Sequence, residues 1–177
     1  FAAASWCSLL SSVLPTGRSN EVGSSATAFA TVINTGPGIA AGCSISPVTS
    51  VPATFLYQTT NPATNALTGT PNTPVDIAEG AAQTFLFAFT PAASFAPTDN
   101  QLAFDCTNTD PAPVTVGLNT FLLSASNTPV ADIVALSATP LNDGIVHIPD
   151  TGSPGSVAIT TANQGASELI FVTEDEA

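Results

Sequence analysis

The chain of 177 residues contains no lysine and a single arginine, Arg18, against 13 Asp and Glu residues, so its formal net charge is -12. Proteins that bind nucleic acids neutralise phosphates with Lys and Arg, and this composition excludes a nucleic-acid partner. A basic patch for an anionic membrane surface is excluded for the same reason. The absence of lysine also excludes a P-loop lysine, a Schiff base and a Lys–Asn isopeptide crosslink.

The sequence also lacks methionine, and no apolar run approaches the roughly 20 residues that a membrane-spanning helix needs. The missing initiator indicates a processed chain from which a signal peptide has been removed. Scattered negative charge keeps such a chain soluble in salty surroundings. We therefore expect a secreted or cell-surface protein without a membrane span, with an acidic cytosolic protein as the alternative.

Side chains for catalysis are equally scarce. His147 is the only histidine and lies in an apolar stretch, where an exposed strand residue is the simpler interpretation than a base. No Cys-x-x-Cys or His-x-x-x-His spacing is present for zinc. The carboxylates, of which a glycosidase needs two facing a cleft, belong to no recognisable motif. We therefore expect no catalytic residue and no enzyme activity.

Most of the residues that the sequence does contain are apolar or polar without charge. The hydrophobic fraction is 44%, charged residues are 8%, and the mean hydropathy is +0.35, which excludes disorder. Short alternating runs lie between Pro-, Gly- and Thr-rich turns, a pattern typical of strands in an antiparallel β-sandwich. The expected strands include residues 26–34, 53–57, 83–90, 101–106 and 114–123.

One of these runs is the clearest core strand. Residues 83–90 place Phe85, Phe87 and Phe89 on one face under the two-residue period of a strand. Residues 26–34 also alternate, with Phe29, Thr31 and Ile33 on one face. Both runs therefore favour a sheet that buries at least one side.

The three cysteines are Cys7, Cys43 and Cys106. Cys43 shares a strand face with Ile45, and Cys106 ends the alternating run of residues 102–106, so both point toward the core. We expect a Cys43–Cys106 disulfide that links the two sheets. The alternative is two buried free thiols. Cys7 is then either a buried apolar residue or paired with another subunit.

Oxygen donors alternate along one loop, at Asp105, Asn108 and Asp110. Calcium prefers such oxygen ligands, and it is the only cofactor that the sequence suggests. The spacing is not that of an EF-hand. The alternative is that these residues form turns by bonding their own backbone.

The strand pattern restarts near Ser124. Residues 29–36, Phe-Ala-Thr-Val-Ile-Asn-Thr-Gly, resemble residues 158–165, Ala-Ile-Thr-Thr-Ala-Asn-Gln-Gly, which indicates a tandem repeat. We therefore expect one β-sandwich domain over residues 1–125. Residues 126–177 then supply additional strands, either a second repeat cut short or an assembly segment.

These additional strands are too few to close a sandwich of their own. We expect them to pair with a neighbouring subunit or to complete one sheet of a larger sandwich. The residues expected at this assembly site are Asp132, Ile133, Val134, Leu136, Ile170 and Phe171.

Residues 29–37 read Phe-Ala-Thr-Val-Ile-Asn-Thr-Gly-Pro and are followed by Gly-Cys-Ser-Ile at residues 42–45. This pattern resembles the Asn-Thr-Gly-Pro repeat domains and the cell-adhesion-related domains of bacterial surface proteins. Residues 77–91 extend the resemblance, which covers roughly residues 22 to 91. It implies an immunoglobulin-like sandwich with a structural or adhesive role and no catalytic residues. The cysteine pair departs from the usual pattern of these families.

Together, these observations predict a non-enzymatic extracellular structural subunit of a bacterial surface assembly, such as a filament, stalk or layer. Its partners are copies of itself or other surface-protein domains. The alternative is a secreted carbohydrate- or ice-binding β module. Such a module needs an exposed aromatic platform, for which Trp6 and Tyr57 are the candidates, or a flat threonine array.

Overall fold

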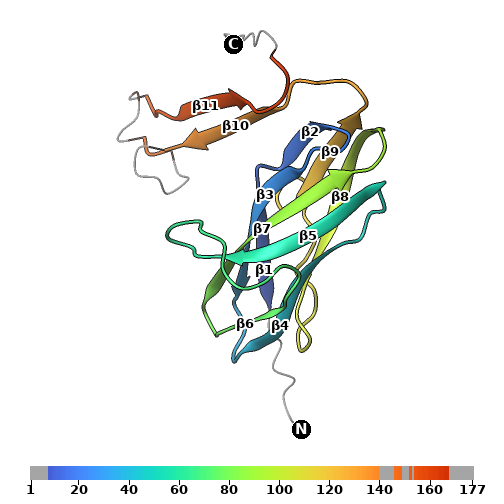
Figure 1. Cartoon of the computed structure of the whole chain (residues 1–177). Coiled ribbons are helices and arrows are strands. Elements are labelled where there is room, and N and C mark those ends of the chain that lie inside the picture. Colours follow the sequence, from blue (N-terminus) through green and yellow to red (C-terminus); the bar gives the residue numbers. More distant parts are fainter. Residues whose placement is uncertain (1–7, 140–145, 149–151, 153, 168–177) are drawn as a thin grey trace.

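The computed structural model describes residues 8–139, 146–148, 152 and 154–167 (Figure 1). Every regular element in these ranges is a β-strand, and none of them is a helix. The all-β expectation is therefore confirmed for the part of the chain that the structure describes. Over the same residues, no helix is long and apolar enough to cross a membrane.

The first sheet has four antiparallel strands in the order β1-β3-β7-β5. Its strands are β1 (Leu9–Leu14), β3 (Ala26–Asn34), β7 (Ala82–Pro91) and β5 (Ala53–Thr60). The long central strands β3 and β7 pair over eight consecutive positions, from Ala26 opposite Phe89 to Ile33 opposite Ala82.

The second sheet has five strands in the order β2-β9-β8-β4-β6. Its strands are β2 (Gly17–Glu21), β9 (Thr120–Ser126), β8 (Phe95–Asp105), β4 (Ala40–Pro47) and β6 (Val75–Ile77). All neighbours are antiparallel except β2 and β9, which run parallel. The chain passes from β1 in one sheet to β2 in the other across the cis peptide bond between Leu14 and Pro15.

The two sheets pack face to face on a shared aromatic core. Phe85, Phe87 and Phe89 of β7 are fully buried, as their alternation predicts. The Phe121 ring of β9 lies 5.1 Å from the Phe87 ring and 5.9 Å from the Phe89 ring, so aromatic contacts join the two sheets. Burial of each such side chain contributes about 1.5–3 kcal/mol.

One face of β3 is buried in the core and the other points outward. Its buried side chains include three alanines, Ala26, Ala28 and Ala30, and each of these lies opposite a Phe of β7. Phe29 and Ile33 point outward and are 36% and 37% exposed. Small residues therefore face the core because the opposite strand already fills that space.

Cys43 and Cys106 form a disulfide, as expected. The expectation that this bond joins the two sheets is wrong. Cys43 lies in β4 and Cys106 directly follows β8, and these strands are neighbours in one sheet, with Ser44 opposite Asp105. Both cysteines are buried because both face the core from that sheet. A buried disulfide indicates that the chain matures in an oxidising environment.

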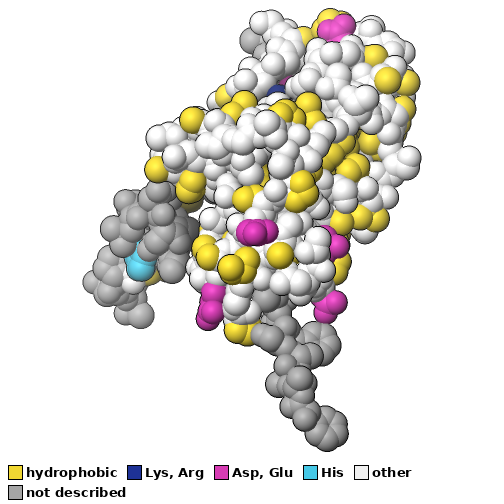
Figure 2. Space-filling model, turned by 60° about the horizontal axis from the view of Figure 1, so that its bottom comes forward, with side chains coloured by type: hydrophobic (Ala, Val, Ile, Leu, Met, Phe, Trp, Pro, Cys, Tyr) yellow, Lys and Arg dark blue, Asp and Glu magenta, His cyan; other side chains and the backbone are white. Residues whose placement is uncertain are grey.

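Strands β10 (Ile133–Ala138) and β11 (Ala158–Asn163) form a separate two-stranded antiparallel sheet, called here the strand pair. It lies beyond the ends of β2 and β9, at the opposite end of the main body, strands β1–β9, from β4 and β6 (Figure 1). Acidic side chains are scattered singly among uncharged ones over the face seen in Figure 2. The negative charge is thus spread out on this face and does not form one patch.

Candidate assembly site

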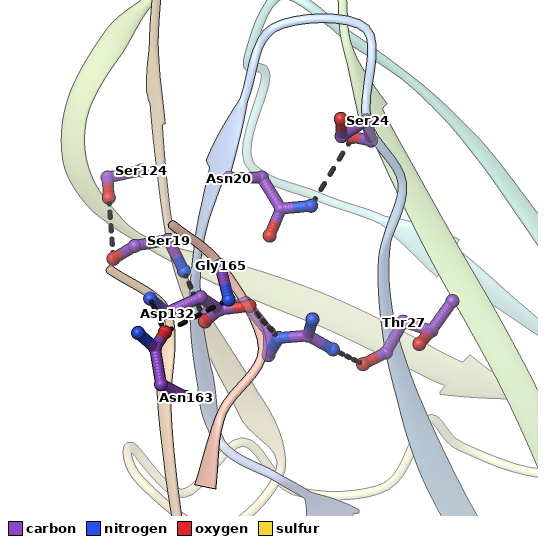
Figure 3. A network of polar contacts seen from close by, with 9 residues as sticks. Ser19, Asn20, Ser24, Thr27, Ser124, Asp132, Asn163 and Gly165 are labelled. Atoms are coloured by element: carbon purple, nitrogen blue, oxygen red, sulfur yellow. Dashed lines mark hydrogen bonds and ion pairs between the residues drawn. The ribbon is translucent and has the colours of Figure 1, made fainter. Parts of the chain in front are cut away.

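The strand pair is attached to the main body by an ion pair. Arg18 Nε of β2 donates to Asp132 Oδ2 across 2.6 Å, and the two side chains are 12% and 3% exposed. Arg18 Nη1 also donates to the Thr27 carbonyl at 2.8 Å. The other carboxylate oxygen of Asp132 accepts the Ser19 backbone N–H at 2.9 Å (Figure 3).

This network gives Asp132 a structural role within its own chain. Its carboxylate is buried and bonds to Arg18 and Ser19, so it anchors the strand pair. A part for Asp132 in assembly stays a prediction. Sequence reasoning missed the connection to Arg18. The available signal was composition, because one cation among 13 acidic residues requires a specific carboxylate if it is buried.

The far side of Asp132 is tied to the end of β11. The Asn163 Oδ1 atom accepts the Asp132 N–H and the Gly165 N–H, both at 3.0 Å. The Gln164 N–H donates to the Asp132 carbonyl at 2.7 Å. Residue 165 must be glycine in this geometry, because a Cβ atom there would lie 2.3 Å from the Val130 carbonyl oxygen. The strand pair is therefore closed and held at one end by a single polar cluster.

Away from this cluster, the strand pair exposes apolar side chains. Ile133 and Leu136 of β10 are 43% and 44% exposed, Ile159 of β11 is 68% exposed, and Val134 is half-buried. Three of the expected assembly residues, Ile133, Val134 and Leu136, thus lie in β10, and Asp132 directly precedes it. The other two, Ile170 and Phe171, lie outside the described residues, as does Cys7.

A groove of about 390 Å³ separates the strand pair from the main body. One wall is formed by Leu14, Pro15 and Leu122, and the other by residues 132–135. Arg18 and Ser19 also line the groove, so the polar cluster lies at its border. Most of the strand pair remains accessible.

The residues expected to bind calcium differ in how their oxygens are engaged. Asn108 Oδ1 accepts the Ala41 N–H at 2.8 Å, and Asn108 Nδ2 donates to the Ile39 carbonyl at 2.9 Å. Asp110 is exposed, whereas the Asp105 Oδ1 atom is buried without a hydrogen-bond partner. The described residues contain no group of three or more His, Cys, Asp or Glu side chains that could hold a metal. Calcium at these residues stays a prediction.

Tyr57 does not provide a ligand platform, because its side chain belongs to the core and is 5% exposed. Its ring packs edge-on against Phe85 at 6.0 Å. Burial raises the pKa of the Tyr57 hydroxyl above its usual value. Trp6, the other candidate platform, lies outside the described residues.

Comparison with known proteins identifies no family for the chain. The chain matches no protein-family model and no curated protein sequence. Among solved structures it is similar to a family 123 glycoside hydrolase from Clostridium perfringens that hydrolyses glycolipid glycans. The identity is 10%, the TM-score is 0.38, and the match covers 67% of this chain and 27% of the hydrolase chain. A likeness this distant carries no argument about fold or activity.

Proposed function

We propose that the chain is a non-enzymatic structural subunit of an extracellular bacterial assembly, a filament, stalk or layer, joined through β-strand contacts. The observation that carries this proposal is the strand pair itself. It is held to the main body by a buried ion pair, yet it exposes apolar side chains such as Ile133 and Ile159. A two-stranded sheet is marginally stable alone, so partner strands would stabilise it.

The strand order supports an immunoglobulin-like architecture for the main body. In such sandwiches the first, second, fifth and fourth strands form one sheet, and the third, sixth and seventh form the other. Strands β1-β3-β7-β5 and β4-β8-β9 fit that order, with β2 added beside β9 and β6 beside β4. This arrangement agrees with the resemblance to the repeat and adhesion domains of bacterial surface proteins.

The Asn-Thr-Gly-Pro segment has a structural role that suits a repeat domain. Asn34 is fully buried at the end of β3, and its Oδ1 atom accepts the Gly36 N–H. Its Nδ2 atom donates to the carbonyls of Gly38 and Ile77. The side chain therefore organises the turn after β3 and ties it to β6, which explains the motif without any ligand.

Secretion is supported by the disulfide and by the composition. The Cys43–Cys106 bond requires an oxidising environment. The absence of lysine and the net charge of -12 suit a protein that stays soluble in extracellular fluid. Its proposed partners are copies of the chain or other surface-protein domains.

Negative-stain microscopy and light scattering of the purified chain test the proposal. We expect ordered polymers or defined oligomers that are lost when residues 126–177 are deleted. The deletion should be made in an Arg18→Met background, because it otherwise leaves the Arg18 guanidinium buried without a carboxylate. Arg18→Met combined with Asp132→Leu in the full-length chain is the control for that background. Separate particles at all concentrations, or polymers that persist after the deletion, would contradict assembly through this segment.

One observation favours the alternative, a carbohydrate- or ice-binding module. The outward face of the four-stranded sheet carries no charged residue and includes Thr27, Thr31 and Thr84, with Thr31 directly opposite Thr84. Such a threonine array on a sheet suits ice or a glycan surface better than it suits a charged partner. Partition into growing ice that is lost in the Thr31→Lys variant would support this function over assembly.

A further inference from the structure

The strand pair repeats the pairing of β1 and β3 in the main body. In the main body, Leu9 lies opposite Asn34, and the Thr35 N–H donates to the Ser8 carbonyl at 2.8 Å. In the strand pair, Ile133 lies opposite Asn163, and the Gln164 N–H donates to the Asp132 carbonyl at 2.7 Å. The register and the closing hydrogen bond are therefore the same.

The turn that follows the second strand is also repeated. Gly36 N–H donates to Asn34 Oδ1 at 3.1 Å, and Gly165 N–H donates to Asn163 Oδ1 at 3.0 Å. In both cases asparagine ends the strand and glycine follows two residues later. The weak sequence similarity between residues 29–36 and 158–165 thus corresponds to the same local geometry.

We propose that β10 and β11 are the first two strands of a second unit with the architecture of the main body. The outer edge of β11, the edge away from β10, would then accept an antiparallel strand in the place that β7 occupies beside β3. The donor is an uncharged extended strand with aliphatic side chains at alternate positions. This inference rests on the proposed function and names the surface through which assembly occurs.

The backbone of β11 is oriented for such a strand. Residues of an antiparallel strand direct their N–H and C=O groups alternately to its two sides. Because Gln164 pairs with β10, Thr160 and Ala162 also direct these groups to β10, whereas Ile159 and Thr161 direct theirs to the outer edge. Among the described residues, no strand pairs with that edge. In β3 the equivalent groups bond to β7.

The side chains of the strand pair indicate what the donor strand contains. Ile159 occupies the position of Ala30 in β3, and it is 68% exposed where Ala30 is 1% exposed. Ile133 likewise replaces the buried Leu9 and is 43% exposed. Since Ala30 lies opposite Phe85 of β7, the larger Ile159 leaves room for a smaller side chain opposite it.

Neither β11 nor β7 contains a charged residue, and this sets the charge of the donor. A charged side chain placed opposite Ile159 would lose its hydration without gaining a partner. The donor therefore resembles β7 in its alternation and neutrality, with valine-sized residues in place of phenylalanine. Main-chain hydrogen bonds supply affinity in such strand addition, and alternate side chains supply specificity.

Amide hydrogen exchange on the full chain tests this inference with a peptide probe. The probe has the sequence of residues 82–91 with Phe85→Val and Phe87→Val, and the control peptide carries Phe85→Ser and Phe87→Ser. We expect the probe to slow exchange at Ile159 and Thr161 by roughly tenfold or more. Thr160 and Ala162, whose N–H groups already bond to β10, should change little. The control peptide should have a much smaller effect.

Two variants of one residue separate edge pairing from other modes of binding. Thr161→Pro removes an N–H from the outer edge and leaves the pairing of β11 with β10 intact, so the slowing at Ile159 should disappear. Thr161→Val keeps the N–H, and the slowing should remain. Protection at Thr160 confirms in each variant that the strand pair is folded.

The outcomes distinguish this inference from the proposed function. Unchanged exchange at Ile159 and Thr161 in a folded strand pair, or equal slowing by both peptides, overturns the inference. If polymers still form in that case, the assembly proposal stands and uses another surface. If the probe slows exchange but only separate particles are seen, the edge inference stands and the assembly proposal fails. If exchange at Ile159 and Thr161 slows as the protein concentration rises in the absence of any peptide, the donor is a second copy of the chain. That result supports both the edge inference and the assembly proposal.

Discussion

At the scale of single residues, Arg18 links the strand pair to the main body. The chain contains one arginine and no lysine, and this arginine forms an ion pair with Asp132, which lies 114 residues away in the sequence. A charge that is mostly buried needs its partner, because little of it remains exposed to water. The position of the strand pair on the main body therefore depends on the Asp132 carboxylate, which binds Arg18 and the Ser19 N–H.

Replacing Asp132 with alanine should detach the strand pair. The change leaves the Arg18 guanidinium mostly buried and unpaired, which costs about 3–5 kcal/mol for a buried pair. Exchange of the Val134 and Leu136 amides, which face β11, should accelerate strongly, while the core amides of β7 keep their protection. Arg18→Met combined with Asp132→Leu is the matched control and should restore most of the protection. Equal exchange rates in Asp132→Ala and the wild type would show that the ion pair does not hold the strand pair.

Tyr57 predicts a loss of stability at alkaline pH. Burial raises its folded-state pKa, so the folded protein binds a proton that the unfolded chain releases above about pH 10. The contribution of Tyr57 is complete below that pH and is lost as the pH rises through the folded-state value. Absorbance at 295 nm follows this titration directly, because Tyr57 is the only tyrosine.

Tyr57→Phe is the matched variant for this titration. Its free energy of unfolding should fall less steeply above pH 10 than that of the wild type, since phenylalanine has no proton to lose. Identical pH profiles for the two proteins would show that the hydroxyl ionises without cost in the folded state.

At the scale of elements, alternation predicted which runs become strands but did not decide their orientation. The Phe-rich run became the central strand β7, yet in β3 the core took the alanine face and left Phe29 exposed. The alternation at residues 114–119 predicts a strand, but residues 116–119 form a turn and the strand begins only at Thr120. There Gly117 has a φ of +78°, and Asn119 Oδ1 accepts the Thr115 N–H. Local side-chain bonding outweighed β-branched composition at that place.

The disulfide makes a second prediction at this scale. The Cys43–Cys106 bond spans a sequence separation of 63 residues, and its loss should lower the free energy of unfolding by about 4 kcal/mol through the entropy of the unfolded chain. Urea denaturation of the variant with both Cys43→Ala and Cys106→Ala measures this loss. Reduction of the wild type with a thiol should give a similar change, and a variant as stable as the wild type would refute the prediction.

The candidate site was predictable only in part. The exposed apolar residues Ile133 and Leu136 could be read from the leftover strand pattern, because alternation after a complete set of strands implies missing partners. The contact between Asp132 and Arg18 could not be read, since no local pattern relates positions so distant in the sequence. The pairing of Cys43 with Cys106 could be predicted because both side chains face the core. That both lie in one sheet could be known only from the order of the strands.

At the scale of the whole molecule, charge should control association. Copies that each carry a net charge of -12 repel one another, and the apolar strand pair must approach a partner against that repulsion. The screening length falls from about 30 Å at 0.01 M salt to about 8 Å at 0.15 M. Assembly measured by light scattering should therefore increase with sodium chloride over this range.

A matched variant isolates the charge effect from the strand contact. Asp110→Asn removes one charge from an exposed position outside the strand pair, and it should shift the salt dependence toward lower concentrations. Association that weakens as salt is added would show that charge attraction, and not apolar strand contact, drives it.

Alternation, the strand faces of the cysteines and composition were enough to predict β-strands, a Cys43–Cys106 pair and the lack of a cationic surface. They did not predict which face of β3 is buried, that one sheet contains both cysteines, or which carboxylate pairs with Arg18. Those outcomes depend on which strands become neighbours. Strand order arises from packing across the whole core, and a local pattern of residues does not encode it.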